Sequence, residues 1–145
     1  MFPRLAKGVC HPSLAIPRRT SERLGMPATL YVCTTCKRGE PVAEGALPPG
    51  AQLHAALQAA GAPDGVRILG VECLSACNTG CAVSLAMPGA WSYVYGHLGP
   101  EHAADILEGA AKYAATTDGI VVWRDRPVIF RKQSIARIPP MEMGQ

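Results

Sequence analysis

Two short apolar runs mark the start of the regular part of the chain. Residues 28–32 (ATLYV) and 66–71 (VRILGV) are rich in strand-forming side chains, which predicts two buried strands. Between them, Leu53 and Leu57 stand four residues apart in an alanine-rich segment that stops at a glycine, which predicts a helix over residues 51–60. A β-α-β unit of this kind makes its two strands parallel through a right-handed crossover.

A hairpin and a second helix follow. Residues 82–87 and 90–95 are predicted strands on either side of Pro88-Gly89, a pair typical of turns. The alternation of Trp91, Tyr93 and Tyr95 predicts a packing face under a helix. Gly99-Pro100-Glu101 favours the start of a helix, because proline suits the first turn and an acidic side chain there interacts well with the helix dipole. The apolar stripe of that helix would be Ala103, Ile106, Leu107, Ala110 and Ala114.

This order of elements predicts an α/β fold of the thioredoxin-like kind. We expect a domain over residues 27–117, a flexible N-terminal extension over residues 1–26 and a loose C-terminal extension over residues 118–145 that contains a short strand. One hypothesis is that Met26, two residues before the first predicted strand, is the true start of the native protein. Because the carboxyl ends of parallel strands meet at one sheet edge, the segments that follow the two strands should lie together, where ligands collect in open α/β sheets.

Composition and charge limit the expected cellular compartment and the classes of partner. No apolar run approaches the roughly 18 residues that span a bilayer, and the N-terminus lacks the apolar region of a signal peptide, so we expect a cytoplasmic protein with no membrane partner. Residues 28–119 carry eight acidic and four basic side chains, which would suit a basic redox partner. Both ends of the chain are basic but show no nucleic-acid motif, so no nucleic-acid partner is expected.

Five of the six cysteines lie in the two segments that follow the predicted parallel strands. Cys33 and Cys36 form a Cys-x-x-Cys motif. Cys73, Cys77 and Cys81 follow one another at intervals of four. Thiolates are soft ligands that select zinc, iron–sulfur clusters or copper(I), and four of them suffice for a zinc site or a common cluster. Spacing therefore predicts a metal centre and leaves the metal open.

Other ligands and catalytic arrangements are not indicated. Both cysteine segments lack histidine, whereas a Rieske centre needs two histidines among its cysteines. Cys10 lies in the predicted loose N-terminus and is not expected to be a ligand. No Ser/His/Asp arrangement, carboxylate pair or phosphate-binding glycine loop stands out, so no catalytic residue is assigned and an electron carrier or metal-binding protein is favoured over an enzyme.

The cysteine segments also carry a resemblance. VCTTCKRG at residues 32–39 and ECLSACNTGC at residues 72–81 resemble the thioredoxin-like [2Fe-2S] ferredoxins, which include a small peripheral subunit of respiratory complex I. Over about residues 28–140, the chain is more closely similar to a bacterial family of predicted metal-binding proteins, often encoded near cobalamin-biosynthesis genes. The stretches that carry this closer similarity are WSYVYG at 91–96, DGIV at 118–121 and FRKQSIARIPP at 130–140.

The ferredoxin resemblance implies a [2Fe-2S] cluster with Cys33, Cys73 and Cys77 among its ligands. Cys36 is the preferred fourth ligand, although the first cysteine pair of those ferredoxins is more widely spaced. Cys81 is the alternative or exchange ligand. The same resemblance implies a protein redox partner and a homodimer.

Three functional hypotheses remain open. The first is a [2Fe-2S] electron carrier. The second is a protein that binds or handles zinc or another metal and is linked to cobalamin metabolism, in which the fifth thiol is a spare ligand. The third is a dithiol oxidoreductase that uses Cys33 and Cys36. It ranks last because thioredoxin-type enzymes place this motif at a helix N-terminus, whereas the next predicted helix here begins well after Cys36.

Overall fold

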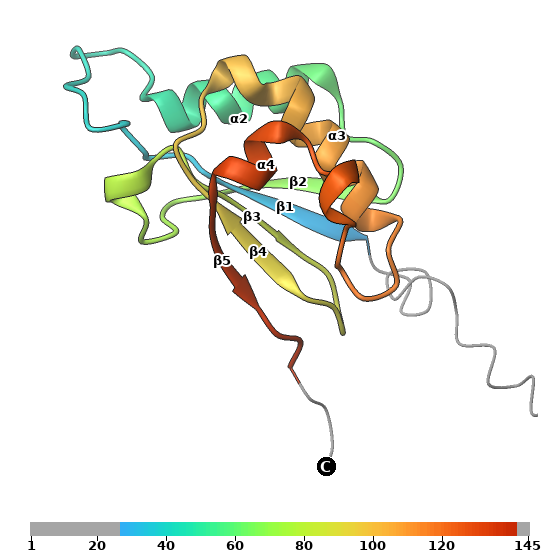
Figure 1. The fold of residues 1–145 in the computed structure, drawn as a ribbon. Coiled ribbons are helices and arrows are strands. Elements are labelled where there is room, and N and C mark those ends of the chain that lie inside the picture. The colour runs from blue at the N-terminus through green and yellow to red at the C-terminus, as the bar shows by residue number, and fades with distance from the viewer. Residues whose placement is uncertain (1–26, 142–145) are drawn as a thin grey trace, which may run out of the picture.

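A five-stranded mixed sheet in the order β2-β1-β3-β4-β5 frames the structure, a computed structural model that describes residues 27–141 (Figure 1). β1 and β2 are parallel, and every other pair of neighbours is antiparallel. The predicted α/β fold with a thioredoxin-like order of elements is confirmed. The strands are β1 (Ala28–Cys33), β2 (Val66–Val71), β3 (Val83–Ala86), β4 (Ser92–Tyr95) and β5 (Ser134–Ile138).

Helices cover one face of this sheet (Figure 1). α2 (Pro49–Ala60) and α3 (Ala103–Ala114) are the two predicted helices, and both form as expected. α4 (Val128–Lys132) is a short third helix that packs against α3. Three single turns of 3₁₀ helix complete the described chain: η2 (Cys77–Thr79), η3 (Pro100–His102) and η4 (Trp123–Asp125).

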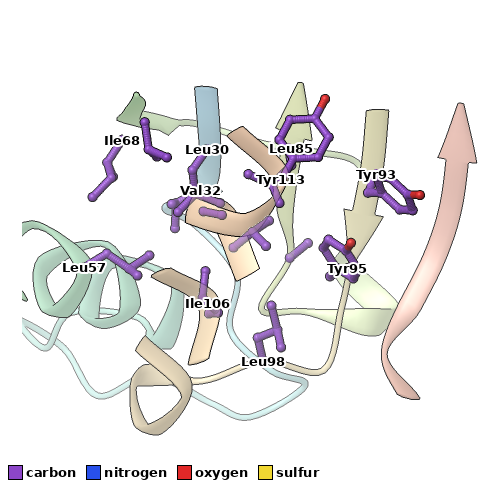
Figure 2. Close-up of a cluster of buried hydrophobic side chains, with 14 of the residues drawn as sticks. Leu30, Val32, Leu57, Ile68, Leu85, Tyr93, Tyr95, Leu98, Ile106 and Tyr113 are labelled. Atoms are coloured by element: carbon purple, nitrogen blue, oxygen red, sulfur yellow. The ribbon is translucent and has the colours of Figure 1, made fainter. Parts of the chain in front are cut away.

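The hydrophobic core fills the space between the sheet and α2 and α3 (Figure 2). Leu30 and Val32 of β1 point to the same side, because side chains alternate along a strand, and both are fully buried. They meet Leu57 of α2 and Ile106 of α3, which are also fully buried. Each such side chain contributes about 1.5–3 kcal/mol relative to an exposed one, which fixes both helices over the sheet.

The aromatic side chains of β4 extend this core, as their alternation predicts. Tyr93 and Tyr95 are 3% and 4% exposed, and their rings stack with centroids 5.8 Å apart. Tyr95 also stacks on Phe130 of α4 at 3.9 Å, and the edge of Tyr113 from α3 meets Tyr93.

The C-terminal residues correct one expectation. Residues 118–145 were predicted as a loose extension outside the domain, but β5 joins the sheet beside β4 and Phe130 is 3% exposed. A Cβ atom on Gly109 of α3 would lie 2.2 Å from the Phe130 ring, so the absence of a side chain there lets α4 dock. Residues 118–141 therefore belong to the folded unit.

The expectations about the N-terminus fall on residues outside the described range. Residues 1–26, with Cys10 and Met26, lie there, so the predicted N-terminal extension stays a prediction. Within residues 27–141, no helix is both long enough and apolar enough to cross a membrane.

Candidate metal centre

The two cysteine segments meet at one edge of the sheet. Cys33, the last residue of β1, lies opposite Val71, the last residue of β2. The backbone N–H of Thr34 donates to Val71 O at 2.8 Å, and the Thr34 hydroxyl donates to the same oxygen at 3.1 Å. The Thr35 hydroxyl donates to the carbonyl of Glu72. The predicted meeting of these segments is confirmed, and β1–β2 pairing produces it.

The Cys-x-x-Cys turn lies against the first turn of α2. Gly50 N–H donates to Cys36 O at 2.9 Å. A Cβ atom on Gly50 would lie 2.2 Å from Cys33 O and 2.9 Å from Cys36 N, so only glycine allows this approach. The predicted gap between Cys36 and the next helix is confirmed, because α2 begins at Pro49. The inference that the motif is therefore remote from a helix N-terminus is wrong, because residues 37–48 return the chain to Cys36.

Three thiols are buried together. Cys33, Cys36 and Cys81 are 2%, 4% and 0% exposed, and the thiol groups of Cys33 and Cys36 share a hydrogen bond. A Cβ atom on Gly80 would lie 3.0 Å from Cys36 Sγ, which places the residue before Cys81 directly beside that sulfur. Cys81 is held by paired backbone hydrogen bonds with Leu98, at 3.1 and 3.2 Å. None of the five cysteines within residues 27–141 forms a disulfide.

The surroundings of the three thiols differ. Burial alone would raise the pKa of Cys33, but hydrogen bonds from the Cys36 thiol and the Leu74 backbone lower that pKa below its ordinary value. Burial, together with the hydrogen bond to Cys33, raises the pKa of Cys36 to about 12. Burial raises the pKa of Cys81 to about 11, against an opposing effect of the Arg38 charge. Of these three buried thiols, Cys33 is therefore the one most readily converted to a metal-binding thiolate.

Cys73 and Cys77 lie on the surface of the adjacent loop. Both are exposed, and the Ser75 backbone N–H donates to Cys73 Sγ at 3.1 Å. They line an open pocket beside Ile135 of β5, whose other walls are Ser75, Ala76, Asn78 and Thr79. Across the described residues, no three His, Cys, Asp or Glu side chains stand close enough to hold a metal ion. The structure thus gathers Cys33, Cys36 and Cys81 and leaves Cys73 and Cys77 in the neighbouring loop.

A charged pair beside the buried thiols was not found by the sequence analysis. Arg38 Nη1 lies 3.2 Å from Glu101 Oε1 of η3, and the charge of Arg38 acts on Cys81. The two partners are far apart in the chain, and Arg38 has no motif of its own beyond following Cys36. No sequence signal identifies their pairing.

Comparisons with known proteins cover most of the chain. A family model described as "Protein of unknown function (DUF1636)" matches residues 30–140, which include both cysteine segments. No curated protein gives a significant match. A thioredoxin-like [2Fe-2S] ferredoxin from Aquifex aeolicus is similar in structure, with 19% identity and a TM-score of 0.49 over 81% of this chain and 98% of that chain. A cysteine-to-serine variant of that ferredoxin gives 18% identity and a TM-score of 0.48 over 75% and 98%.

Proposed function

The chain belongs to the DUF1636 family, whose function is undefined, so we propose a function from its own residues: it binds a [2Fe-2S] cluster and carries electrons. We assign the ligands to Cys33, Cys36, Cys73 and Cys77. One observation supports this most strongly. The parallel pair β1 and β2 brings two segments with several thiols each to a single sheet edge, at the ends where ligands collect.

The chemistry of the donors fits such a cluster. Four thiolates are the usual ligand set of a [2Fe-2S] centre. The Leu74 backbone N–H already stabilises negative charge on the Cys33 sulfur, and hydrogen bonds of this kind also adjust the potential of a ligated cluster. Cys33 and Cys36 would form its buried side, whereas the exposed Cys73 and Cys77 would form the side nearest to a partner. When bound, the cluster would supply one-electron transfer.

Metal and sulfide analysis of anaerobically purified full-length protein tests the proposal. We expect about two iron and two sulfide per chain, and a visible absorbance that bleaches on reduction. A colourless protein without iron after anaerobic reconstitution would overturn it. One equivalent of zinc without sulfide would instead support the metal-handling alternative, whose link to cobalamin metabolism stays a prediction.

A dithiol oxidoreductase is a second candidate, favoured by the contact between the Cys33 and Cys36 thiols at the start of α2. In this reaction, Cys33 Sγ attacks one sulfur of a small-molecule disulfide and releases the other as a thiol. Cys36 Sγ then attacks Cys33 Sγ, releasing the second thiol and leaving a Cys33–Cys36 disulfide. The substrate is reduced by two electrons and the protein is oxidised by two.

Burial of both sulfurs limits access for such a substrate, so the dithiol function ranks behind the cluster. The variant Cys36→Ser and the cluster-loaded wild-type protein together separate the two functions. With glutathione disulfide as the probe, a dithiol enzyme would accumulate a mixed disulfide on Cys33 in Cys36→Ser, visible as added mass. An electron carrier, tested as the cluster-loaded wild-type protein, would neither reduce glutathione disulfide nor gain such an adduct.

A further inference from the structure

The ion pair between Arg38 and Glu101 lies directly against the backbone of Gly99. A Cβ atom on Gly99 would lie 2.4 Å from Arg38 Nη1 and 2.4 Å from Glu101 Oε2, so glycine leaves the space that both charged groups occupy. The carboxylate of Glu101 is also 3.9 Å from His102 Nδ1, which accepts a hydrogen bond from Gly99 N–H at 3.0 Å. The side chains of Arg38 and Glu101 are 35% and 54% exposed, so water reaches the pair but does not surround Arg38.

The backbone places this pair next to the buried thiols. Leu98, the neighbour of Gly99, exchanges two hydrogen bonds with Cys81. Arg38 itself follows Cys36 by two residues, and a Cβ atom on Gly80, the residue before Cys81, would lie 3.0 Å from Cys36 Sγ. The positive charge of Arg38 therefore lies near the buried thiols and acts on Cys81.

We propose that Arg38 raises the reduction potential of the cluster. Glu101 holds the Arg38 side chain in place and offsets part of the Arg38 charge. This inference rests on the proposed cluster function. Reduction adds an electron to a centre whose thiolates already carry negative charge, so a nearby cation stabilises the reduced form more than the oxidised form. A neighbouring carboxylate has the opposite effect. Neither side chain needs to touch the cluster, because charge acts over distance at a partly buried site.

Reduction potentials of the cluster-loaded variants test this proposal. The potential is followed through the visible absorbance of the cluster during an anaerobic titration with dithionite and redox mediators. We expect Arg38→Gln to lower the potential and Glu101→Gln to raise it. Arg38→Lys, which keeps the charge, should stay near the wild-type value. The double variant should fall between the two single ones, and every shift should shrink at high salt, because the pair is partly exposed.

Arg67→Gln is the matched control. Arg67 lies opposite Thr29 of β1 in the strand register, whereas Val71, at the other end of β2, lies opposite Cys33. Four residues of strand span about 13 Å at roughly 3.3 Å per residue, which exceeds the Debye length of about 8 Å at physiological salt. The reduction potential of Arg67→Gln should therefore match that of the wild-type protein.

The outcomes separate this inference from the function beneath it. If the wild-type protein takes up no iron and sulfide, the proposed function fails and this inference with it. If the cluster is present but Arg38→Gln and Glu101→Gln leave the potential unchanged, only the role of Arg38 is overturned. Where Arg38→Gln loses its cluster, the other two variants decide the question: an unchanged potential in Glu101→Gln, or a clearly shifted one in Arg38→Lys, would overturn the role of Arg38.

Discussion

Cys36 and Cys81 are both buried, but of the two only Cys36 shares a hydrogen bond with the Cys33 thiol. The backbone of Cys81 exchanges two hydrogen bonds with Leu98. These surroundings support the proposed assignment of Cys36 as the fourth ligand, with Cys81 as the alternative or exchange ligand.

Alanine substitutions at these two positions test the ligand assignment. We expect Cys36→Ala to reduce bound iron and sulfide to background and Cys81→Ala to retain them, because only the first change removes a ligand. Iron and sulfide per chain are measured after anaerobic reconstitution, with circular dichroism to show that both variants fold. The reverse pattern would make Cys81 the fourth ligand.

Gly50 allows the Cys-x-x-Cys turn to approach α2, so its substitution should act on the site. Gly50→Ala places a methyl group 2.2 Å from Cys33 O, and backbone atoms cannot move aside cheaply. We expect a loss of about 1–3 kcal/mol in the free energy of unfolding and a marked loss of bound iron. Gly109→Ala, equally crowded but against Phe130, is the control: it should lose stability in urea unfolding and keep the cluster. Equal iron loss in both variants would show a general effect of instability.

At this scale, the sequence predicted the thiols but not their surroundings. Cys33 is the last residue of β1 and Cys73 comes two residues after β2, so the strand pattern was enough to bring their segments together. The roles of Gly50 and Arg38 depend on how the segment from residue 37 to 48 turns back to the sheet. That path has no periodic pattern from which it could have been predicted.

Among the helices and strands, those with a periodic pattern of apolar residues could be predicted from the sequence. β1, β2, α2 and α3 have strong apolar patterns, and their predicted bounds fall close to the observed ones. α4 has only five residues, and all five residues of β5 are exposed, so neither has an alternation to detect. Their place in the fold comes from contacts with α3 and β4, which are far away in the sequence.

Phe130 provides a test of whether the C-terminal elements stabilise the fold. Phe130→Ala removes a 3%-exposed ring that stacks on Tyr95, so we expect a loss of about 3–5 kcal/mol in the free energy of unfolding. Val128→Ala, in the same helix but 56% exposed, should change it by less than about 0.5 kcal/mol. Urea titrations of both variants give the comparison. A loss as small in Phe130→Ala as in Val128→Ala would mean that α4 docks weakly.

At the scale of the whole molecule, the buried tyrosines make the stability of the fold depend on pH in the alkaline range. Burial raises the pKa of Tyr95 and of Tyr113 above the ordinary value for tyrosine, and the Tyr113 hydroxyl also donates to Trp91 O at 2.6 Å. Because the folded-state pKa of each phenol exceeds its unfolded-state pKa, their contribution to stability is fully present below about pH 10. It is lost as the pH rises towards the folded-state values, because the unfolded chain ionises first.

Alkaline titration of the folded protein measures this linkage. Absorbance near 295 nm counts ionised tyrosines, and far-ultraviolet circular dichroism reports unfolding at the same pH. We expect at least two of the four tyrosines to ionise only as the fold is lost, with urea stability falling steadily above about pH 10. Tyr95→Phe should remove one phenol from the late step and make stability less sensitive to pH in that range, because its ring can still stack on Phe130. Complete ionisation of all four tyrosines before any loss of helix signal would contradict the burial of these hydroxyls, and with it the packing of β4 beneath α3.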